Sequence, residues 1–263
     1  MINLHPLYSS SSGNSFHIDN GKDQLLIDAG VTYKALCSGL KSIHQDFSKL
    51  SAVLITHEHS DHIKGLPLLC RKNRIPIYAC GKTADYLKQM LKESNITADI
   101  YKVEYDKPFR IKDFEITPFE TPHDAVMPCG YRISSGNKTL TYATDLGHVT
   151  SDVYENLQAA NYCVLEANYD IAMLDFGKYP FPLKRRIKSP MGHLSNDLSA
   201  ATIVKLIRHG QTDFLLAHLS ENNNTPFIAS NTIQSLLLQN DIDPNLVHIH
   251  FASKSLSSEE YQI

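Results

Sequence analysis

The densest group of residues able to bind a metal is a short loop with the pattern H-x-H-x-D-H, made of His57, His59, Asp61 and His62. It directly follows residues 52–56 (AVLIT), an apolar run rich in β-branched side chains that predicts a buried strand. Loops at strand ends are where α/β proteins place their chemistry. Imidazole and carboxylate groups bind zinc, manganese and iron. We therefore predict a metal-binding loop, because an ordinary solvated loop has no need of three histidines and one aspartate so close together.

A loop this short cannot easily point four groups at one ion, but it can divide them between two. His57 and His59 would then bind one metal, and Asp61 and His62 the other. Further ligands are expected at the ends of later strands, where three candidates lie: His123, Asp145 and His218. The carboxylate of Asp145 could bridge the two ions. The pattern thus predicts a centre of two divalent metal ions, with Zn, Mn and Fe as candidates.

The remaining histidines carry less information, since a lone histidine is usually structural or solvated. Of the 13 in the chain, seven are expected to serve only core or surface packing: His5, His17, His44, His148, His209, His248 and His250. His248 and His250 point to one face of a predicted strand and could in principle bind a metal. A third ligand is missing nearby in the sequence, so packing is the favoured interpretation.

Strand and helix patterns alternate along the chain and place the candidate ligands at strand ends. Strands are predicted at residues 15–19, 24–28, 52–56, 76–79, 114–118, 129–134, 139–143, 162–166, 214–218 and 247–251. Helices are predicted at residues 83–93, 195–209 and 225–239, with a short one between 145 and 160. Without a long linker or low-complexity segment, the pattern predicts a single α/β domain over residues 1–263, built of packed α and β layers.

Composition limits the choice of partners. Of the 263 residues, 42% are hydrophobic and 20% are charged, and the net charge is -3, so a nucleic acid would need a local basic patch. The five cysteines lie far apart without a C-x-x-C pair, which argues against a disulfide framework and favours a cytoplasmic location. A signal peptide and a membrane span are not expected from the apolar pattern, and no pattern predicts a protein partner.

The H-x-H-x-D-H loop followed by histidine, aspartate and histidine resembles the metallo-β-lactamase superfamily across nearly the whole chain. The resemblance implies a four-layer αββα sandwich with two metals at one edge. It assigns His57, His59 and His123 to the first metal, Asp61, His62 and His218 to the second, and makes Asp145 the bridge. Position 59 is glutamate in flavodiiron-type relatives, so a histidine there implies hydrolytic rather than redox chemistry.

Further stretches resemble the YycJ/WalJ group of this superfamily. They are residues 12–15 (SGNS), 25–30 (LLIDAG), 165–170 (LEANYD), 192–196 (GHLSN) and 219–223 (LSENN). The group looks related to the tRNA 3′-processing endonucleases, and its members are regarded as DNA exonucleases or nuclease-like hydrolases. The resemblance implies a phosphodiesterase in which a metal-bridged hydroxide attacks phosphorus.

Two residues are predicted to be catalytic. Asp61, also a ligand, would orient the attacking water. His193 precedes an expected helix start at Ser195, and a helix N-terminus favours phosphate. In the tRNA-processing relatives a histidine in a similar G-H-S-T segment protonates the leaving group, and the resemblance implies this role for His193. Leu194 departs from that pattern, and the alternative is a histidine that caps the helix or supports the ligands.

Five residues are predicted to contact the substrate: Asn14, Asn168, Lys184, Arg186 and Asn196. Lys184 and Arg186 belong to the run KRRIK at residues 184–188, which could clamp a phosphodiester backbone or simply be a solvated stretch. The asparagines lie in loops that match the group, as does Asn222, although asparagine is also a common turn former.

Two other functions remain open. One is hydrolysis of a small phosphodiester, lactone or thioester by the same metals. The basic run and the GHLSN segment argue against a lactone, because a neutral lactone needs no phosphate-binding helix end. The other is a metal-binding regulatory protein without turnover. The size of the ligand set argues against it, since a structural zinc site is usually closed and four-coordinate.

Overall fold

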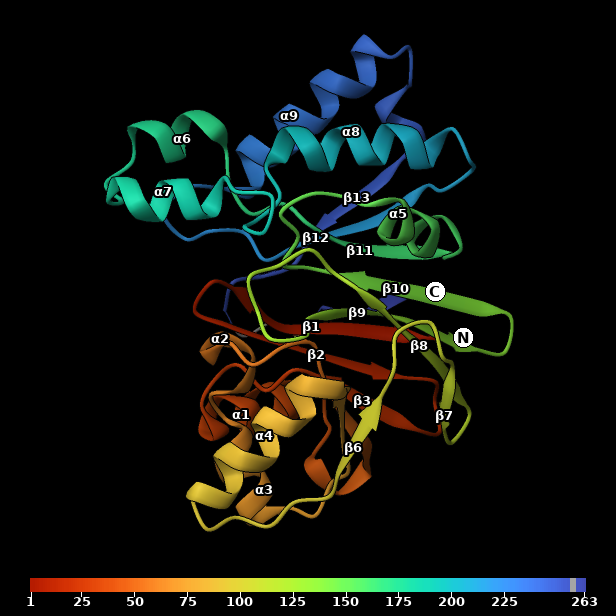
Figure 1. The fold of residues 1–263 in the computed structure, drawn as a ribbon. Helices are drawn as coiled ribbons and strands as arrows, with labels where there is room; N and C mark the ends of the chain where they lie inside the picture. The colour runs from red at the N-terminus through yellow and green to blue at the C-terminus, as the bar shows by residue number, and fades with distance from the viewer. Residues whose placement is uncertain (256–258) are drawn as a thin grey trace.

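Two seven-stranded sheets pack face to face, and helices cover the outer face of each (Figure 1). The computed structural model describes residues 1–255 and 259–263. The first sheet has the strand order β14-β1-β2-β3-β4-β5-β6, and the second has the order β13-β12-β11-β10-β9-β8-β7. The layers are therefore α, β, β, α, which confirms the four-layer sandwich expected from the sequence.

The first half of the chain builds the first sheet and its helices. The strands are β1 (Asn3–Ser10), β2 (Gly13–Asp19), β3 (Gln24–Ile27), β4 (Leu50–Ile55), β5 (Ile77–Cys80), β6 (Ile100–Val103) and, from the C-terminus, β14 (Tyr261–Gln262). The helices are α1 (Tyr33–Ser42), α2 (Ser60–Ile63), α3 (Leu66–Lys72) and α4 (Gly81–Glu93), with the 3-10 turn η1 (Phe47–Lys49). Figure 1 shows α1, α3 and α4 on the outer side of this sheet.

The second half builds the second sheet. The strands are β7 (Phe109–Ile111), β8 (Phe114–Glu120), β9 (Cys129–Ser135), β10 (Lys138–Ala143), β11 (Tyr162–Glu166), β12 (Asp213–Ala217) and β13 (His248–Phe251). The helices are α5 (Ser151–Gln158), α6 (Ile171–Phe176), α7 (Phe181–Ile187), α8 (Asn196–Ile207) and α9 (Pro226–Gln239), with the 3-10 turn η2 (Pro244–Leu246). In Figure 1, α5, α8 and α9 cover this sheet, while α6 and α7 project to one side as a pair.

Parallel pairing brings distant loops to the same edge of the sandwich. Strands β3 to β6 run parallel in the first sheet, as do β10 to β13 in the second. The carboxyl ends of parallel strands meet at one edge, so the loops that follow β4, β10 and β12 converge there. Hydrogen bonds join the sheets at this edge, among them those from Tyr131 Oη to Ile55 O at 2.7 Å and from Cys129 N to Thr56 O at 3.0 Å.

Every strand predicted from the sequence is present, with ends shifted by a residue or two. The predicted starts of two helices are confirmed to within one residue, because α8 begins after Ser195 and α9 after Thr225. The side chains of Ser195 and Thr225 cap them by accepting from the backbone N–H of Leu198 and Ile228. The strands β1, β6, β7 and β14 and the helices α1, α2, α3, α6 and α7 were not predicted. In β1 the alternating pattern is broken by a register shift between Pro6 and Tyr8. Within the described residues, none of the helices has the length and apolarity needed to span a bilayer.

Gly30 lets the H-x-H-x-D-H loop pack against the end of β3. A Cβ atom on Gly30 would lie 1.6 Å from the carbonyl oxygen of Asp61 and 2.6 Å from the backbone nitrogen of Asn14. Both of these are backbone atoms, so neither can rotate away. A side chain at position 30 would therefore displace the loop that carries the predicted ligands.

We expect Gly30→Ala to lower the free energy of unfolding by at least the roughly 1–3 kcal/mol typical of overpacking, as measured by urea denaturation. The matched control is Gly21→Ala in an exposed turn, where φ is +83° and the nearest described atoms are more than 4 Å from the new Cβ. Gly21→Ala should lower the free energy of unfolding by only about 1 kcal/mol, the cost of placing alanine at a positive φ. Equal stability of Gly30→Ala and the wild type would contradict the packing described here.

Candidate metal centre

All seven predicted metal ligands lie together where the two sheets meet. They come from the loops that follow four strands, β4, β8, β10 and β12: His57, His59, Asp61, His62, His123, Asp145 and His218. Within the part of the chain that the structure describes, their nitrogen and oxygen atoms fall into overlapping groups in which every ligand atom lies within 4.8 Å of the others. Both sheets contribute, so the cluster forms only when the sandwich is closed.

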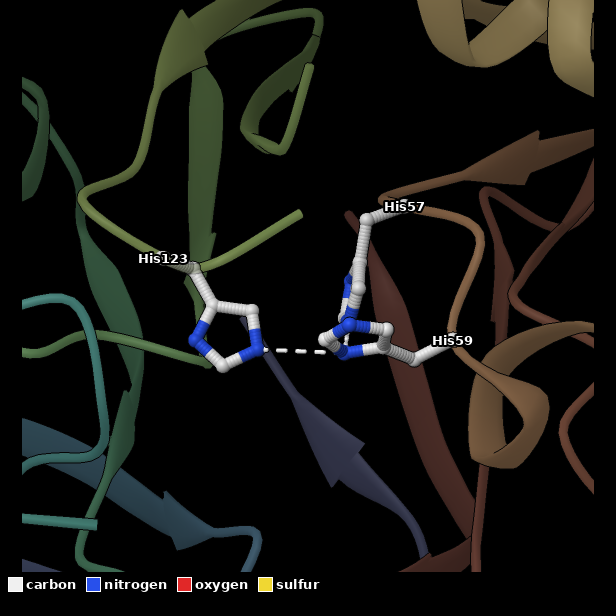
Figure 2. A group of neighbouring side chains, drawn as sticks. All are labelled: His57, His59 and His123. Carbon is white, nitrogen blue, oxygen red and sulfur yellow. Dashed lines mark hydrogen bonds between the residues drawn. The ribbon is translucent and has the colours of Figure 1, made fainter. Parts of the chain in front are cut away.

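The first group consists of three imidazoles. His59 Nδ1 lies 3.1 Å from His57 Nε2 and 3.3 Å from His123 Nε2 (Figure 2). Figure 2 shows His57 and His59 reaching from one side of the gap between the sheets and His123 from the other. A ligand spacing near 3.4 Å is about what a tetrahedral ion with metal–nitrogen distances near 2.1 Å requires.

The second group combines a carboxylate with two imidazoles. Asp61 Oδ2 lies 3.4 Å from His62 Nε2 and 3.6 Å from His218 Nε2. His59 precedes the first turn of α2, and Asp61 lies within that turn, where the positive end of the helix favours a carboxylate. The first two predicted ligands of the loop, His57 and His59, therefore lie in one group, and the last two, Asp61 and His62, lie in the other.

Asp145 lies between the two groups. One of its oxygens, Oδ2, is 3.5 Å from His62 Nε2, and the other, Oδ1, is 3.7 Å from His123 Nε2 and 3.3 Å from His218 Nδ1. Asp145 and His218 both have φ of 57°, the left-handed region that ordinary residues rarely adopt. Strained backbone of this kind persists only where the surroundings impose it, and it is commonest at functional sites.

Four ligand imidazoles are oriented by acceptors bonded to their Nδ1 atoms. The pairs are His57 with Thr56 Oγ1 at 3.0 Å, His62 with Asp28 Oδ2 at 2.7 Å, His123 with Gly192 O at 2.9 Å and His218 with Glu166 Oε1 at 2.8 Å. The Thr56 hydroxyl is free to accept because its own hydrogen goes to Asp28. Each acceptor therefore holds a hydrogen on Nδ1 and leaves Nε2 directed to the centre, the orientation that metal-binding histidines have.

Sequence reasoning missed two buried carboxylates, Asp28 and Glu166. Asp28 accepts from the backbone and hydroxyl of Thr56 and from His62, so it fixes the strand end before the H-x-H-x-D-H loop. Glu166 accepts from both His193 and His218 through Oε1, and from the backbone N–H groups of Leu146 and Leu194 through Oε2. Both belong to stretches that carried the family resemblance, LLIDAG and LEANYD. Their position at strand ends was the available signal.

The donor set fits divalent cations. Asp145 Oδ2 and His218 Nε2 are buried polar atoms without a hydrogen-bond partner among the described residues, and both face the centre. Burial lowers the pKa of His57 well below its ordinary value, so that ring is neutral. Burial also acts to lower the pKa of His218, but Asp145, Asp61 and Glu166 outweigh it and raise this pKa to about 10. Without metal, protons on the imidazoles offset the negative charge of the carboxylates, and bound divalent ions would replace these protons.

His193 lies beside the cluster. Its Nδ1 is 2.9 Å from Glu166 Oε1, its ring centroid is 5.1 Å from that of His123 and 5.2 Å from that of His218, and its side chain is 14% exposed. The carboxylate holds the Nδ1 hydrogen, which leaves Nε2 directed away from Glu166. The ring therefore reaches both the ligands and the solvent-facing side of the centre.

The three asparagines predicted to contact the substrate are all buried. Asn14 Nδ2 lies 3.3 Å from His62 Nε2, and Asn168 Nδ2 donates to His218 O at 2.8 Å. Asn196 exchanges two hydrogen bonds with Asn224, at 3.0 and 2.8 Å. The structure thus brings Asn14 and Asn168 to the metal ligands and places Asn196 in the interior at the start of α8. The exposed Asn222 donates to Tyr179 Oη.

The two predicted basic contacts, Lys184 and Arg186, both lie on α7. Arg186 makes a bidentate ion pair with Asp124, at 2.6 and 2.8 Å, next to the ligand His123. Lys184 Nζ donates to the carbonyl oxygens of Asp175 and Gly177, and so caps the C-terminal end of α6. Arg186 therefore lies near the metal ligands, whereas Lys184 is bonded within the α6–α7 pair.

Comparison with known proteins agrees with this geometry. Residues 23–219 match the family model of the beta-lactamase superfamily domain. The chain belongs to the beta-lactamase superfamily. It is 36% identical over 239 residues to the exodeoxyribonuclease YycJ of Bacillus anthracis, covering 90% of this chain and 89% of the relative. It is 37% identical, also over 239 residues, to the exodeoxyribonuclease WalJ of Streptococcus pneumoniae, covering 90% of this chain and 88% of that one.

These identities confirm the YycJ/WalJ group within the superfamily. Among solved structures, the fold is similar to that of Zn²⁺-bound PqqB from Methylobacterium extorquens, with a TM-score of 0.74 and 16% identity over 99% of this chain and 100% of the other. At that identity the likeness shows the fold alone. It agrees with an αββα sandwich whose histidine and aspartate groups can hold divalent metal ions.

We expect Glu166→Gln to weaken metal binding, because the amide cannot accept from both His193 and His218 and from two backbone N–H groups. A loss of about 10–100-fold in affinity is typical when such an orienting group is removed. Competition with a chromogenic chelator would measure it. The control is Glu58→Gln, which removes a charge from the H-x-H-x-D-H loop at a carboxylate that accepts from Val126 N. Unchanged affinity in Glu166→Gln would show that Glu166 does not position the ligands.

Proposed function

We propose that this chain is a metal-dependent hydrolase with two divalent ions that cleaves phosphodiester bonds in DNA as an exonuclease. The observation that carries the proposal is the pair of ligand groups that share Asp145, with His193 beside them. Two relatives that align over most of their length are named exodeoxyribonucleases, which favours DNA as the substrate. Zn, Mn and Fe all suit the ligands. We also propose a cytoplasmic location, supported by five free cysteines, and a single domain.

The seven ligands would hold the two ions, with His57, His59 and His123 on one, Asp61, His62 and His218 on the other, and Asp145 on both. When bound, the ions would supply an activated water and neutralise charge on the phosphate. The protein contributes the geometry, because outer acceptors fix the hydrogen on Nδ1 of four of the imidazoles. Binding therefore requires little rearrangement of the side chains.

Asp61 and His193 are the proposed catalytic residues. The side chain of Asp61 is 22% exposed, so the carboxylate can accept a hydrogen bond from the attacking water and orient it. His193 is held through Nδ1 by Glu166, and Nε2 is then the atom that donates a proton to the departing oxygen. We propose that Asn14, Asn168 and Asn196 act from the interior, by holding the ligands and the start of α8.

The α6–α7 pair offers a surface suited to a single strand of nucleic acid. Phe176 and Phe181 are 91% and 77% exposed. Phe181, Lys184, Arg185 and Lys188 line one hollow on this surface. Aromatic rings that stack bases, interleaved with cations that follow the backbone, are the usual elements of such a surface. The chain then runs from α7 to Gly192 and His193, so a strand lying here would lead to the metal centre.

The test is cleavage of end-labelled single- and double-stranded DNA and RNA by metal-reconstituted protein. We expect a product ladder from DNA that is lost on chelation and in His59→Ala. His193→Gln should lower kcat by roughly 10²–10⁴-fold, the range for general acid catalysis, with little change in metal content. The control is His148→Gln, an exposed histidine whose Nδ1 binds Pro190 O.

Three results would contradict the proposal. One is full activity in both His193→Gln and Asp61→Asn, which would remove the assigned roles. Another is a metal-loaded protein that leaves all nucleic acids intact but hydrolyses bis(p-nitrophenyl) phosphate, a lactone or a thioester, which would assign another substrate. The third is metal binding without hydrolysis of any of these, which would indicate a regulatory protein.

A further inference from the structure

A second group of potential metal ligands lies on β1 and β2, outside the centre described above. It consists of His5, His17 and Asp19. His5 lies opposite His17 in the antiparallel register, and His17 lies opposite Leu26 on β3. Residues opposite one another on neighbouring strands lie on the same face of a sheet. Leu26 packs against the helices that cover the outer face of the first sheet, so His5, His17 and Asp19 lie on this outer face. Asp19 is five residues along β2 from Asn14, which contacts His62, and this separation along the strand is about 17 Å.

The spacing of the three side chains suits one ion. Asp19 Oδ2 lies 3.5 Å from His5 Nε2 and 3.9 Å from His17 Nδ1, and the two imidazole centroids are 5.4 Å apart. A tetrahedral zinc ion with bonds near 2.1 Å places its ligand atoms about 3.4 Å apart. A small inward movement of the side chains would therefore complete the geometry.

His17 is prepared as a ligand by its other nitrogen. Nε2 lies 3.2 Å from Gln24 Oε1, and Gln24 Nε2 in turn donates to Gln45 Oε1 at 2.9 Å, which sets the orientation of the amide. Because Gln24 Oε1 can only accept, His17 carries its hydrogen on Nε2 and has a lone pair on Nδ1. The ring is fully buried, and Nδ1 lacks a hydrogen-bond partner among the described residues. Burial lowers the pKa of His17 to about 4, so the ring is neutral.

Asp19 brings a largely buried carboxylate to the same place. Its Oδ1 accepts from Asn3 Nδ2 and from Gly21 N, both at 3.0 Å, so Oδ2 is left to face the imidazoles. The residue is 8% exposed, and a buried carboxylate needs a cation. The nearby Lys22 is paired with Asp113 at 2.7 Å. A lone pair and a carboxylate directed at each other from a buried site are stabilised by a metal ion between them.

We propose that His5, His17 and Asp19 form a further metal site, which binds one zinc ion and ties β1 to β2. An imidazole–imidazole–carboxylate set is a zinc ligand set, and the limited exposure of His5 and Asp19 leaves room for water at the fourth position. The site would stabilise the strand that carries Ser9, whose hydroxyl accepts from the backbone N–H of the ligand His218 at 2.8 Å.

The test is the zinc content of the folded protein, by mass spectrometry of the metal after removal and reloading. Asp19→Asn should bind one zinc fewer per chain than the wild type, because the amide replaces the anionic ligand without changing its shape. The matched control, Asp23→Asn, neutralises an equally buried carboxylate in the adjoining turn and should keep the full complement. His5→Gln at the edge of the site is the second variant and should also lose one zinc.

Thermal unfolding separates this loss from misfolding. An asparagine amide can donate to the His17 lone pair, so metal-free Asp19→Asn should melt no lower than metal-free wild type. Added Zn²⁺ should then raise the melting temperature of the wild type more than that of the variant. Activity of the other centre is not the readout, so failure of the proposed nuclease function would leave this test intact. Equal zinc content in wild type, Asp19→Asn and His5→Gln, or an equal loss in Asp23→Asn, would overturn the proposal.

Discussion

The structure depends on placing one carboxylate, that of Asp145, between imidazoles from both sheets. Desolvating a carboxylate at this depth is costly unless positive charge surrounds it. Burial alone would raise the pKa of Asp145, but the positive charges of His218 and His62 hold it well below its ordinary value. The left-handed backbone at Asp145 and His218 is the local cost of this arrangement. Divalent ions at the same position would offset the charge more completely than protons do.

The sandwich architecture makes that arrangement possible. Parallel strands bring the ends of β4, β10 and β12 to one edge, and the contacts of Tyr131 and Cys129 with the end of β4 hold the two sheets in register there. Ser9 on β1 accepts from the backbone of His218, so an element far from the ligands in sequence also sets their position. A substitution along this edge should therefore shift the predicted metal ligands, even where the substituted residue does not contact them.

The residues of the candidate metal centre could be picked out from the sequence because their signal is local. The H-x-H-x-D-H spacing is a property of six consecutive residues, and His123, Asp145 and His218 follow segments that read as strands. The roles of Asp28 and Glu166 could not be predicted, because each acts on residues 20 or more positions away. His5 and His17 were assigned to packing because only the strand register brings them together with Asp19. The pairing of Asn196 with Asn224 was hidden for the same reason.

The most direct test of the central claim is an electron paramagnetic resonance spectrum of the Mn²⁺-reconstituted protein. It is best recorded on Asp19→Asn, so that Mn²⁺ at the second site does not contribute. Two ions that share Asp145 lie about 3.5–4 Å apart and should give a spin-coupled spectrum. Asp145→Asn should convert that spectrum to the signal of isolated ions. An uncoupled signal from the protein with Asp145 intact would contradict the shared centre on which the account depends.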